Sequence, residues 1–139
     1  MKLLLDTNIV IDIASKRQGY VASRDLLRFC ELHRVEGFVS TTTVTDAMYI
    51  LRKYLAPGSV REAVRVLLNI LDVVEVQKSD VMCALEGDWR DFEDAVQAAC
   101  ATRNKMNYIV SRNVEDFSAS AVKAISPEEA LKILKNCCI

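Results

Sequence analysis

The sequence predicts an α/β protein with a mainly parallel central sheet of about four or five strands. Short apolar segments that can be buried on both faces alternate with segments of helical periodicity along the chain. This alternation is typical of parallel sheets, whose strands are connected by helices. Ligands of such sheets bind beyond the carboxyl ends of the strands, so functional side chains are expected at those ends.

The first half of the chain begins with the apolar run Leu3–Leu5, which indicates a buried strand over 2–5, and a helix is expected over 7–15. Helical periodicity returns over 21–33, and GFVS at 37–40 is a short apolar strand. The helix expected over 43–55 has an apolar stripe formed by Val44, Ala47, Met48, Leu51 and Leu55.

The second half continues the alternation after a turn at Pro57-Gly58. A helix is expected from there to Leu71, followed by the strand VVEV at 73–76 and a short helix at 79–86. The helix over 92–104 is rich in alanine, which allows a neighbouring element to approach closely. YIV at 108–110 and the weaker pattern at 122–125 complete the strands, and a final helix runs from Pro127 to about residue 135.

Composition indicates one domain over residues 1–139, since 51% hydrophobic residues in a chain of this length can form a substantial core. The apolar run before Asp6 is too short for a secretory signal, and no stretch reaches the roughly 18 apolar residues of a membrane span. We therefore expect a soluble, cytoplasmic protein. Five cysteines without C-x-x-C spacing and a single histidine, His33, indicate reduced thiols and no ordinary zinc site.

Charge is nearly balanced, at −1 overall, which excludes the global basic character of many nucleic-acid binders. Its local distribution is uneven. Residues 16–34 contain five basic and two acidic side chains, whereas residues 86–94 contain five acidic and one basic. A solvated helix face explains the basic segment, and a phosphate substrate beside a cation-filled acidic pocket would use both segments.

Acidic residues follow the ends of the expected strands. Asp6 ends the first strand, Asp46 comes shortly after 37–40, and Asp116 follows 108–110. Asp94 opens the alanine-rich helix, with Asp91 three residues earlier on roughly the same face. Because parallel strands bring their carboxyl ends to one edge, we expect these acids to lie close together.

Helix capping is the alternative explanation for single acids in this set. Thr43-x-x-Asp46 and Asp91-x-x-Asp94 resemble capping arrangements, and Asp6 could cap the helix that follows it. Capping does not explain why the acids share one sheet edge, where carboxylates repel unless they are protonated or bridged by cations. Oxygen ligands suit Mg²⁺ or Mn²⁺. The other aspartates considered are assigned to the surface or to caps: Asp12, Asp25, Asp72 and Asp80.

Four segments together resemble the PIN-domain family: LLLDTNIVID, an acid after the second strand, DFEDAVQAACA, and YIVSRNVEDF. The resemblance runs in order across residues 3–117, and the length of the chain also fits. It implies a three-layer α/β/α fold with helices on both faces of the sheet. Many members are toxin ribonucleases of bacterial and archaeal toxin–antitoxin pairs.

The resemblance implies an Mg²⁺- or Mn²⁺-dependent endoribonuclease that hydrolyses RNA to 5′-phosphate and 3′-hydroxyl products. Asp6 and Asp94 match the principal metal ligands, and Asp46 and Asp116 match second ligands or residues that orient the water. Asp46 stands where the family usually has glutamate and is one methylene shorter. Supporting or phosphate-contacting roles fall to Thr7, Asn8, Asp91, Ser111, Arg112 and Asn113.

The resemblance also implies two kinds of protein partner, a second copy of the chain and a small antitoxin. The basic residues within 16–28 are expected to contact the RNA backbone, which would make binding sensitive to salt.

Three alternatives to a nuclease also place acids at the ends of strands. A haloacid-dehalogenase-type phosphatase needs a second aspartate two residues after the first, where this chain has Asn8. A phospho-receiver domain needs a lysine after a late strand, and none follows 108–110 before Lys123. The third alternative keeps the PIN fold as a catalytically weakened RNA-binding or protein-binding module, with Asp46 marking the weakened site.

Overall fold

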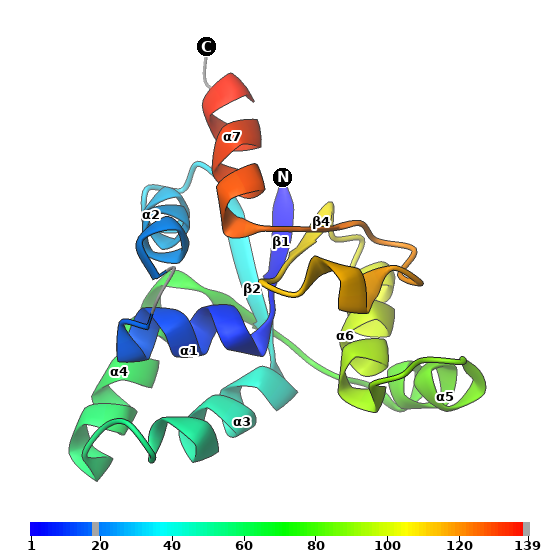
Figure 1. Ribbon diagram of the computed structural model, residues 1–139, viewed down its shortest axis with the longest axis horizontal. Coiled ribbons are helices and arrows are strands. Elements are labelled where there is room, and N and C mark those ends of the chain that lie inside the picture. Colours follow the sequence, from blue (N-terminus) through cyan, green and yellow to red (C-terminus); the bar gives the residue numbers. More distant parts are fainter. Residues whose placement is uncertain (18–19, 138–139) are drawn as a thin grey trace.

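Five parallel strands form the central sheet, in the order β3-β2-β1-β4-β5 (Figure 1). This computed structural model describes residues 1–17 and 20–137. The prediction of a mainly parallel sheet is confirmed, including its fifth strand. The strands are β1 (Lys2–Leu5), β2 (Glu36–Ser40), β3 (Asp72–Val74), β4 (Tyr108–Val110) and β5 (Ala124–Ile125).

Helices cover both faces of the sheet, which confirms the three-layer arrangement (Figure 1). Side chains alternate along β1, so that Leu3 and Leu5 pack with the larger group of helices and Leu4 packs with the alanines of α6. The larger group consists of α1 (Thr7–Ser15), α2 (Tyr20–Glu31), α3 (Thr41–Leu51), α4 (Pro57–Ile70) and α7 (Pro127–Cys137). The other face carries α5 (Lys78–Glu86), α6 (Phe92–Arg103) and the 3-10 turn η1 (Val114–Phe117).

Element boundaries differ from the predictions in a few places. Helix α3 begins at Thr41 rather than at 43, because Ser40 caps it by accepting a hydrogen bond from the backbone N–H of Thr43 (3.1 Å). It ends at Leu51 rather than near 55. Strand β3 ends at Val74, and the backbone N–H of Val76 instead donates to the hydroxyl of Thr41 (3.3 Å). Strand β5 occupies only the last two residues of 122–125.

None of the described helices is long and apolar enough to cross a membrane. The described cysteines that are free thiols are Cys30, Cys83, Cys100 and Cys137, and Cys138 lies outside the described residues. His33 is exposed in a left-handed turn after α2 (φ 56°), as expected of a histidine at a helix end.

Gly37 in β2 allows the sheet to approach two buried side chains closely. A Cβ there would lie 2.6 Å from Cδ2 of Leu71 and 2.7 Å from Sγ of Cys30. We expect Gly37→Ala to lower the free energy of unfolding by about 1–3 kcal/mol, because both neighbours must move within the core. Urea denaturation measures the change.

Gly58→Ala is the matched control for this substitution. No atom lies within 4 Å of a Cβ at Gly58, in the first turn of α4, and alanine favours a helix. We expect Gly58→Ala to unfold at the same urea concentration as the unsubstituted chain or a higher one. Equal stability of the Gly37 and Gly58 variants would contradict the close packing at Gly37.

Candidate active site

The site begins at the carboxyl ends of β1 and β4, where the sheet places Asp6 beside Ser111. Leu5 pairs with Val110 in the ladder, and the backbone N–H of Asp6 donates to the carbonyl of Val110 (2.9 Å). The Ser111 hydroxyl donates to Oδ2 of Asp6 (2.8 Å) and accepts from the backbone N–H of Asn113 (3.1 Å). Ser111 therefore fixes one oxygen of the Asp6 carboxylate.

The second oxygen of Asp6 accepts a hydrogen bond from the backbone N–H of Thr7 (2.8 Å), and Asp6 is the N-cap of α1. Asp6 is only 9% exposed. Burial raises the pKa of Asp6, while its hydrogen bonds with Ser111 and Thr7 act in the opposite direction. The capping and functional explanations are compatible here, because one carboxylate caps the helix and faces the site.

A buried polar network joins the three helices that surround Asp6. The Thr43 hydroxyl of α3 accepts from the Gln97 side-chain amide of α6 (2.8 Å) and from the Ser40 hydroxyl (3.3 Å). The Thr43 hydroxyl also has one proton to donate. Because its two other contacts are accepted hydrogen bonds, this proton is donated to the Thr7 hydroxyl of α1 (3.0 Å). This role of Gln97 was not predicted, and its signal in the sequence is a long polar side chain among alanines.

Asp46 lies in the second turn of α3, so the capping interpretation of Thr43-x-x-Asp46 is wrong. Its side chain instead forms a hydrogen bond with Glu93 at the start of α6, and this bond, followed by burial, raises the pKa of Glu93 to about 8. Glu93 is not among the site residues predicted from the sequence. The available signal was its place beside Asp94 in DFED, but a sequence does not show which wall of a site a side chain reaches.

Asp91 and Asp94 lie at the N-terminus of α6 as predicted. Asp91 is the N-cap and accepts a hydrogen bond from the backbone N–H of Asp94 (3.0 Å). Asp94 is half-buried, and burial, followed by the charges of Asp6, Asp91 and Asp116, raises its pKa to about 7. The acids of different elements therefore lie close enough to repel one another.

All of these acids line a cavity of about 550 Å³, here called the carboxylate cavity. It contains the four predicted catalytic and metal-binding residues, Asp6, Asp46, Asp94 and Asp116, and its other acids are Asp91 and Glu93. The predicted supporting residues Thr7, Asn8 and Asn113 also line it.

The carboxylate cavity has the donor chemistry that a hard divalent cation prefers, because oxygen ligands dominate its polar lining. The negative charges of neighbouring acids contribute to the raised pKa values of Asp94 and Glu93, after burial for Asp94 and after the hydrogen bond with Asp46 and burial for Glu93. Over residues 1–17 and 20–137, no three acidic, cysteine or histidine side chains converge into a preformed metal cluster.

Arg112 does not line the carboxylate cavity, and its predicted contact with phosphate stays a prediction. Its Nε forms an ion pair with Oδ2 of Asp12 (3.0 Å), and Nε of Arg17 pairs with Oδ1 (3.1 Å). Asp12 is fully buried, so its assignment to the surface or to a cap is wrong. Asp80 caps α5 but is also buried against Arg103 (3.0 Å). A buried carboxylate needs such partners because its desolvation is otherwise unfavourable.

Basic residues of the segment 16–28 are divided between two places. Arg17 lines the carboxylate cavity. Arg24 and Arg28 lie on the exposed face of α2, in ion pairs with Asp25 (3.1 Å) and Glu31 (3.8 Å). Only Arg17 of these arginines is therefore placed at the site.

A parallel α/β sheet whose carboxyl edge gathers acids around one cavity is the arrangement that the resemblance to the PIN-domain family implies. The sequence profile of the PIN domain matches residues 2–115, so the chain belongs to the PIN-domain family. None of the curated protein sequences compared with the chain matches it.

Solved structures of VapC-type proteins share this fold. VapBC2 from Rickettsia felis, bound to a promoter DNA fragment, is 15% identical with a TM-score of 0.70, and the alignment covers 91% of this chain and 98% of that one. DNA-bound VapBC from Salmonella typhimurium is 17% identical with a TM-score of 0.69, and the alignment covers 91% of this chain and 98% of that one. VapC20 of Mycobacterium tuberculosis is described as a toxin that cleaves the sarcin-ricin loop. It is 11% identical with a TM-score of 0.63, and the alignment covers 77% of this chain and 86% of that one.

The raised pKa of Asp94 contributes, together with those of Glu93 and Asp6, to a change of the stability of the metal-free chain with pH. Between the ordinary value of 3.8 and about 7, the folded chain holds a proton that the unfolded chain releases. Stability therefore falls as pH rises through this range. We expect thermal unfolding midpoints in EDTA to decrease from pH 4 to pH 7, and Asp94→Asn to reduce this decrease.

Two results would contradict this account of Asp94. One is an Asp94→Asn chain with the same pH dependence as the unsubstituted chain. The other is a thermal unfolding midpoint that rises from pH 4 to pH 7 in the unsubstituted chain but not in the Asp94→Asn variant.

Proposed function

We propose that this protein is a divalent-cation-dependent endoribonuclease and the toxin of a toxin–antitoxin pair. The observation that carries the proposal is the carboxylate cavity, in which acids from β1, α3, α6 and η1 meet at the carboxyl edge of the sheet. Membership of the PIN-domain family supports nuclease chemistry. The similarity of fold to VapC20, described as cleaving the sarcin-ricin loop, supports RNA as the substrate.

Asp6 and Asp94 are the residues proposed to hold Mg²⁺ or Mn²⁺ principally, with Asp46 and Asp116 as second ligands or as groups that orient the attacking water. Ser111 and the backbone N–H of Thr7 keep the Asp6 carboxylate in one orientation. When bound, the cation supplies a Lewis acid that activates water and neutralises charge on the phosphodiester. Hydrolysis then leaves a 5′-phosphate and a 3′-hydroxyl.

The position of Glu93 helps to decide between an active nuclease and the alternative in which Asp46 marks a catalytically weakened binding module. Aspartate at 46 is one methylene shorter than the usual glutamate, but the hydrogen bond between Asp46 and Glu93 brings a second carboxyl group to the same wall. We propose that Glu93 provides the reach that Asp46 lacks. This favours an active nuclease over the binding module.

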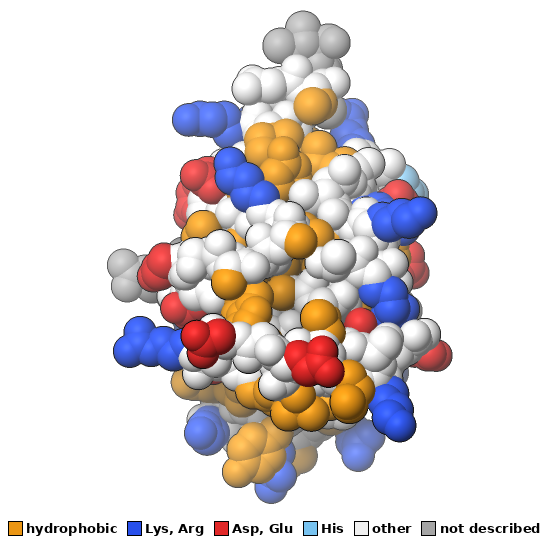
Figure 2. Space-filling view, turned by 90° about the vertical axis from the view of Figure 1, so that its right-hand side faces the viewer, with side chains coloured by type: hydrophobic (Ala, Val, Ile, Leu, Met, Phe, Trp, Pro, Cys, Tyr) orange, Lys and Arg blue, Asp and Glu red, His pale blue; other side chains and the backbone are white. Residues whose placement is uncertain are grey.

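A small antitoxin and a second copy of the chain are the proposed protein partners. Support comes from the fold shared with the VapBC structures and from exposed apolar side chains on α5 and at the start of α6. Figure 2 shows hydrophobic side chains gathered between charged ones on this side of the molecule. The exposed residues are Met82, Leu85 and Phe92. A small reading frame directly upstream would support the antitoxin, and light scattering measures the oligomeric state.

Replacing Asp6 or Asp94 by asparagine tests the nuclease directly. We expect each variant to lose at least about a hundredfold in RNA cleavage, more than the usual loss for a residue that only orients a ligand. Wild type and variants are assayed on structured and single-stranded RNAs with Mg²⁺, Mn²⁺ or EDTA. Asp25→Asn, on the exposed face of α2, is the control and should cleave normally.

Absence of cleavage of every RNA, together with absence of Mn²⁺ binding by calorimetry, would overturn the nuclease proposal and favour the binding module. Cleavage that continues in EDTA would overturn the metal dependence.

Glu93→Gln and Asp46→Glu test the compensation between these two positions. We expect Glu93→Gln to reduce metal-dependent cleavage roughly tenfold, within the range for groups that support metal ligands. Adding Asp46→Glu should restore most of this loss, because glutamate supplies the missing methylene. Single-turnover cleavage of one RNA by the four chains measures both effects. Additive losses, without rescue, would contradict the compensation.

A further inference from the structure

Gln97 is a buried polar residue to which the proposed mechanism gives no role. It lies one turn after Glu93 in the alanine-rich helix α6 and is 2% exposed. Its side-chain nitrogen donates to the Thr43 hydroxyl (2.8 Å), while its side-chain oxygen is buried without a hydrogen-bond partner among the described residues. A buried oxygen of this kind lowers the stability of the fold, so a reason for its presence is expected.

The contacts of Thr43 give a direction to the hydrogen bonds that lead from α6 to α1. The Gln97 amide nitrogen can only donate, and the Ser40 hydroxyl also donates to Thr43 (3.3 Å). Both lone pairs of the Thr43 oxygen are therefore occupied, and its proton is donated to the Thr7 hydroxyl (3.0 Å). Because the Thr7 oxygen accepts this bond, its own proton remains for a different acceptor.

Thr7 is half-buried and lines the carboxylate cavity. Among the hydrogen bonds of the described residues, its hydroxyl contacts only Thr43. Thr7 directly follows Asp6, the proposed ligand of the cation, so its hydroxyl lies next to the residues proposed to act on a phosphodiester. A donor whose direction is fixed before the substrate binds stabilises negative charge on a phosphate oxygen without reorganisation.

We propose that Gln97 is a positioning residue that acts through Thr43 to keep the Thr7 hydroxyl as a hydrogen-bond donor to a phosphate oxygen in the carboxylate cavity. The inference rests on the proposed ribonuclease function and deepens it. The unpartnered oxygen of Gln97 follows from this role. If the amide were turned over, its oxygen would accept the Thr43 proton, and Thr7 would then donate to Thr43 instead of to the phosphate.

A purely structural role, in which Gln97 only joins α6 to α3, is the alternative. The hydrogen bond between Asp46 and Glu93 already joins these two helices, one turn further along each of them. An apolar side chain of the same size would also pack against the alanines without an unsatisfied oxygen. The structural role therefore does not explain why position 97 is a glutamine.

Gln97→Met separates the two roles, because methionine nearly keeps the volume and removes both polar atoms. We expect the urea midpoint of unfolding to stay the same or rise, since the unpartnered oxygen is removed. Single-turnover cleavage of RNA at saturating Mn²⁺ should slow about threefold to tenfold, as for loss of one hydrogen bond, while Mn²⁺ affinity measured by calorimetry is unchanged. Lower stability with unchanged cleavage would make Gln97 structural only and would overturn the proposal.

A double-mutant cycle with Thr7→Val determines whether Gln97 acts through Thr7. Thr7→Val removes the donor, and we expect it to slow cleavage about tenfold and to weaken the binding of inorganic phosphate, measured by calorimetry with Mg²⁺, by a similar factor. Gln97→Met alone should weaken phosphate binding as it slows cleavage. In the Thr7→Val chain, Gln97→Met should have no further effect on either quantity. Additive effects of the two substitutions would overturn the proposal.

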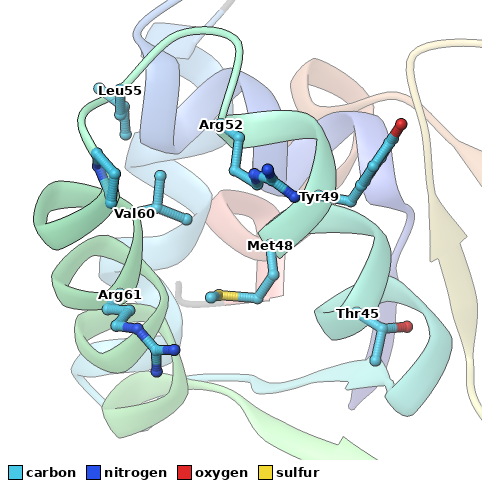
Figure 3. A pocket seen from close by; sticks show the side chains of 8 residues that line it. Thr45, Met48, Tyr49, Arg52, Leu55, Val60 and Arg61 are labelled. Atoms are coloured by element: carbon cyan, nitrogen blue, oxygen red, sulfur yellow. The ribbon is translucent and has the colours of Figure 1, made fainter.

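Thr43→Ser and Thr45→Val are the matched controls for Thr43→Val. Serine keeps the hydroxyl and should retain cleavage and phosphate binding, whereas valine interrupts the hydrogen bonds and should act like Gln97→Met. Thr45 lies on the same helix at the hollow of about 640 Å³ between α3 and α4, and its hydroxyl donates to the backbone carbonyl of Thr42 (2.9 Å) (Figure 3). Thr45→Val should therefore change neither quantity. Equal effects of Thr43→Val and Thr45→Val would contradict the proposal.

Phosphate binding keeps the test of Gln97 separate from the test of the nuclease. Coupled effects of Gln97→Met and Thr7→Val on phosphate binding, in a chain whose wild type cuts no RNA, would retain the role of Gln97 and overturn the nuclease. Cleavage by wild type together with additive effects would do the reverse. A wild type that neither cuts RNA nor binds phosphate would overturn both.

Discussion

The buried hydroxyl of Thr43 is the contact on which the site depends, because it joins helices whose carboxylates repel one another. It lies between Thr7 of α1 and Gln97 of α6, and Ser40 holds it from the end of β2. Ser40 and Gln97 are buried and Thr7 is half-buried, so loss of a contact with Ser40 or Gln97 would leave an unsatisfied polar group in the core. The hydrogen bonds thus oppose the repulsion between the acids of α1 and α6.

Helix N-termini lower the free-energy cost of gathering these charges. Asp6 caps α1 and Asp91 caps α6, with Asp94 in the first turn, so three acids meet free backbone N–H groups and the positive end of a helix dipole. Capping and the proposed cation binding are therefore two uses of the same geometry. Repulsion nevertheless remains, as the raised pKa values of Asp94 and Glu93 show.

The arginines beside the carboxylate cavity form ion pairs with the buried Asp12 rather than with the acids that line the cavity. Asp12 binds Arg17 and Arg112 through their Nε atoms and leaves the rest of each guanidinium partly exposed. An arginine pointing into the cavity would neutralise the carboxylates and occupy the space of a cation. The ion pairs with Asp12 instead hold the Nε atoms of Arg17 and Arg112 beside α1.

The order of strands and helices along the chain, the parallel sheet and the gathering of Asp6, Asp46, Asp94 and Asp116 can be predicted from the sequence alone. These follow from local periodicity and from the rule that parallel strands end at one edge. That Glu93 meets Asp46, that Asp12 is buried and that Gln97 reaches Thr43 is visible only in the folded chain. Contacts of this kind join residues far apart in the sequence: Thr7 and Thr43 are 36 positions apart, and Asp6 and Ser111 are 105 positions apart. They depend on how each helix is rotated about its axis when it packs. Local patterns do not contain that rotation, because it is set by the side chains of all the elements packed against each helix.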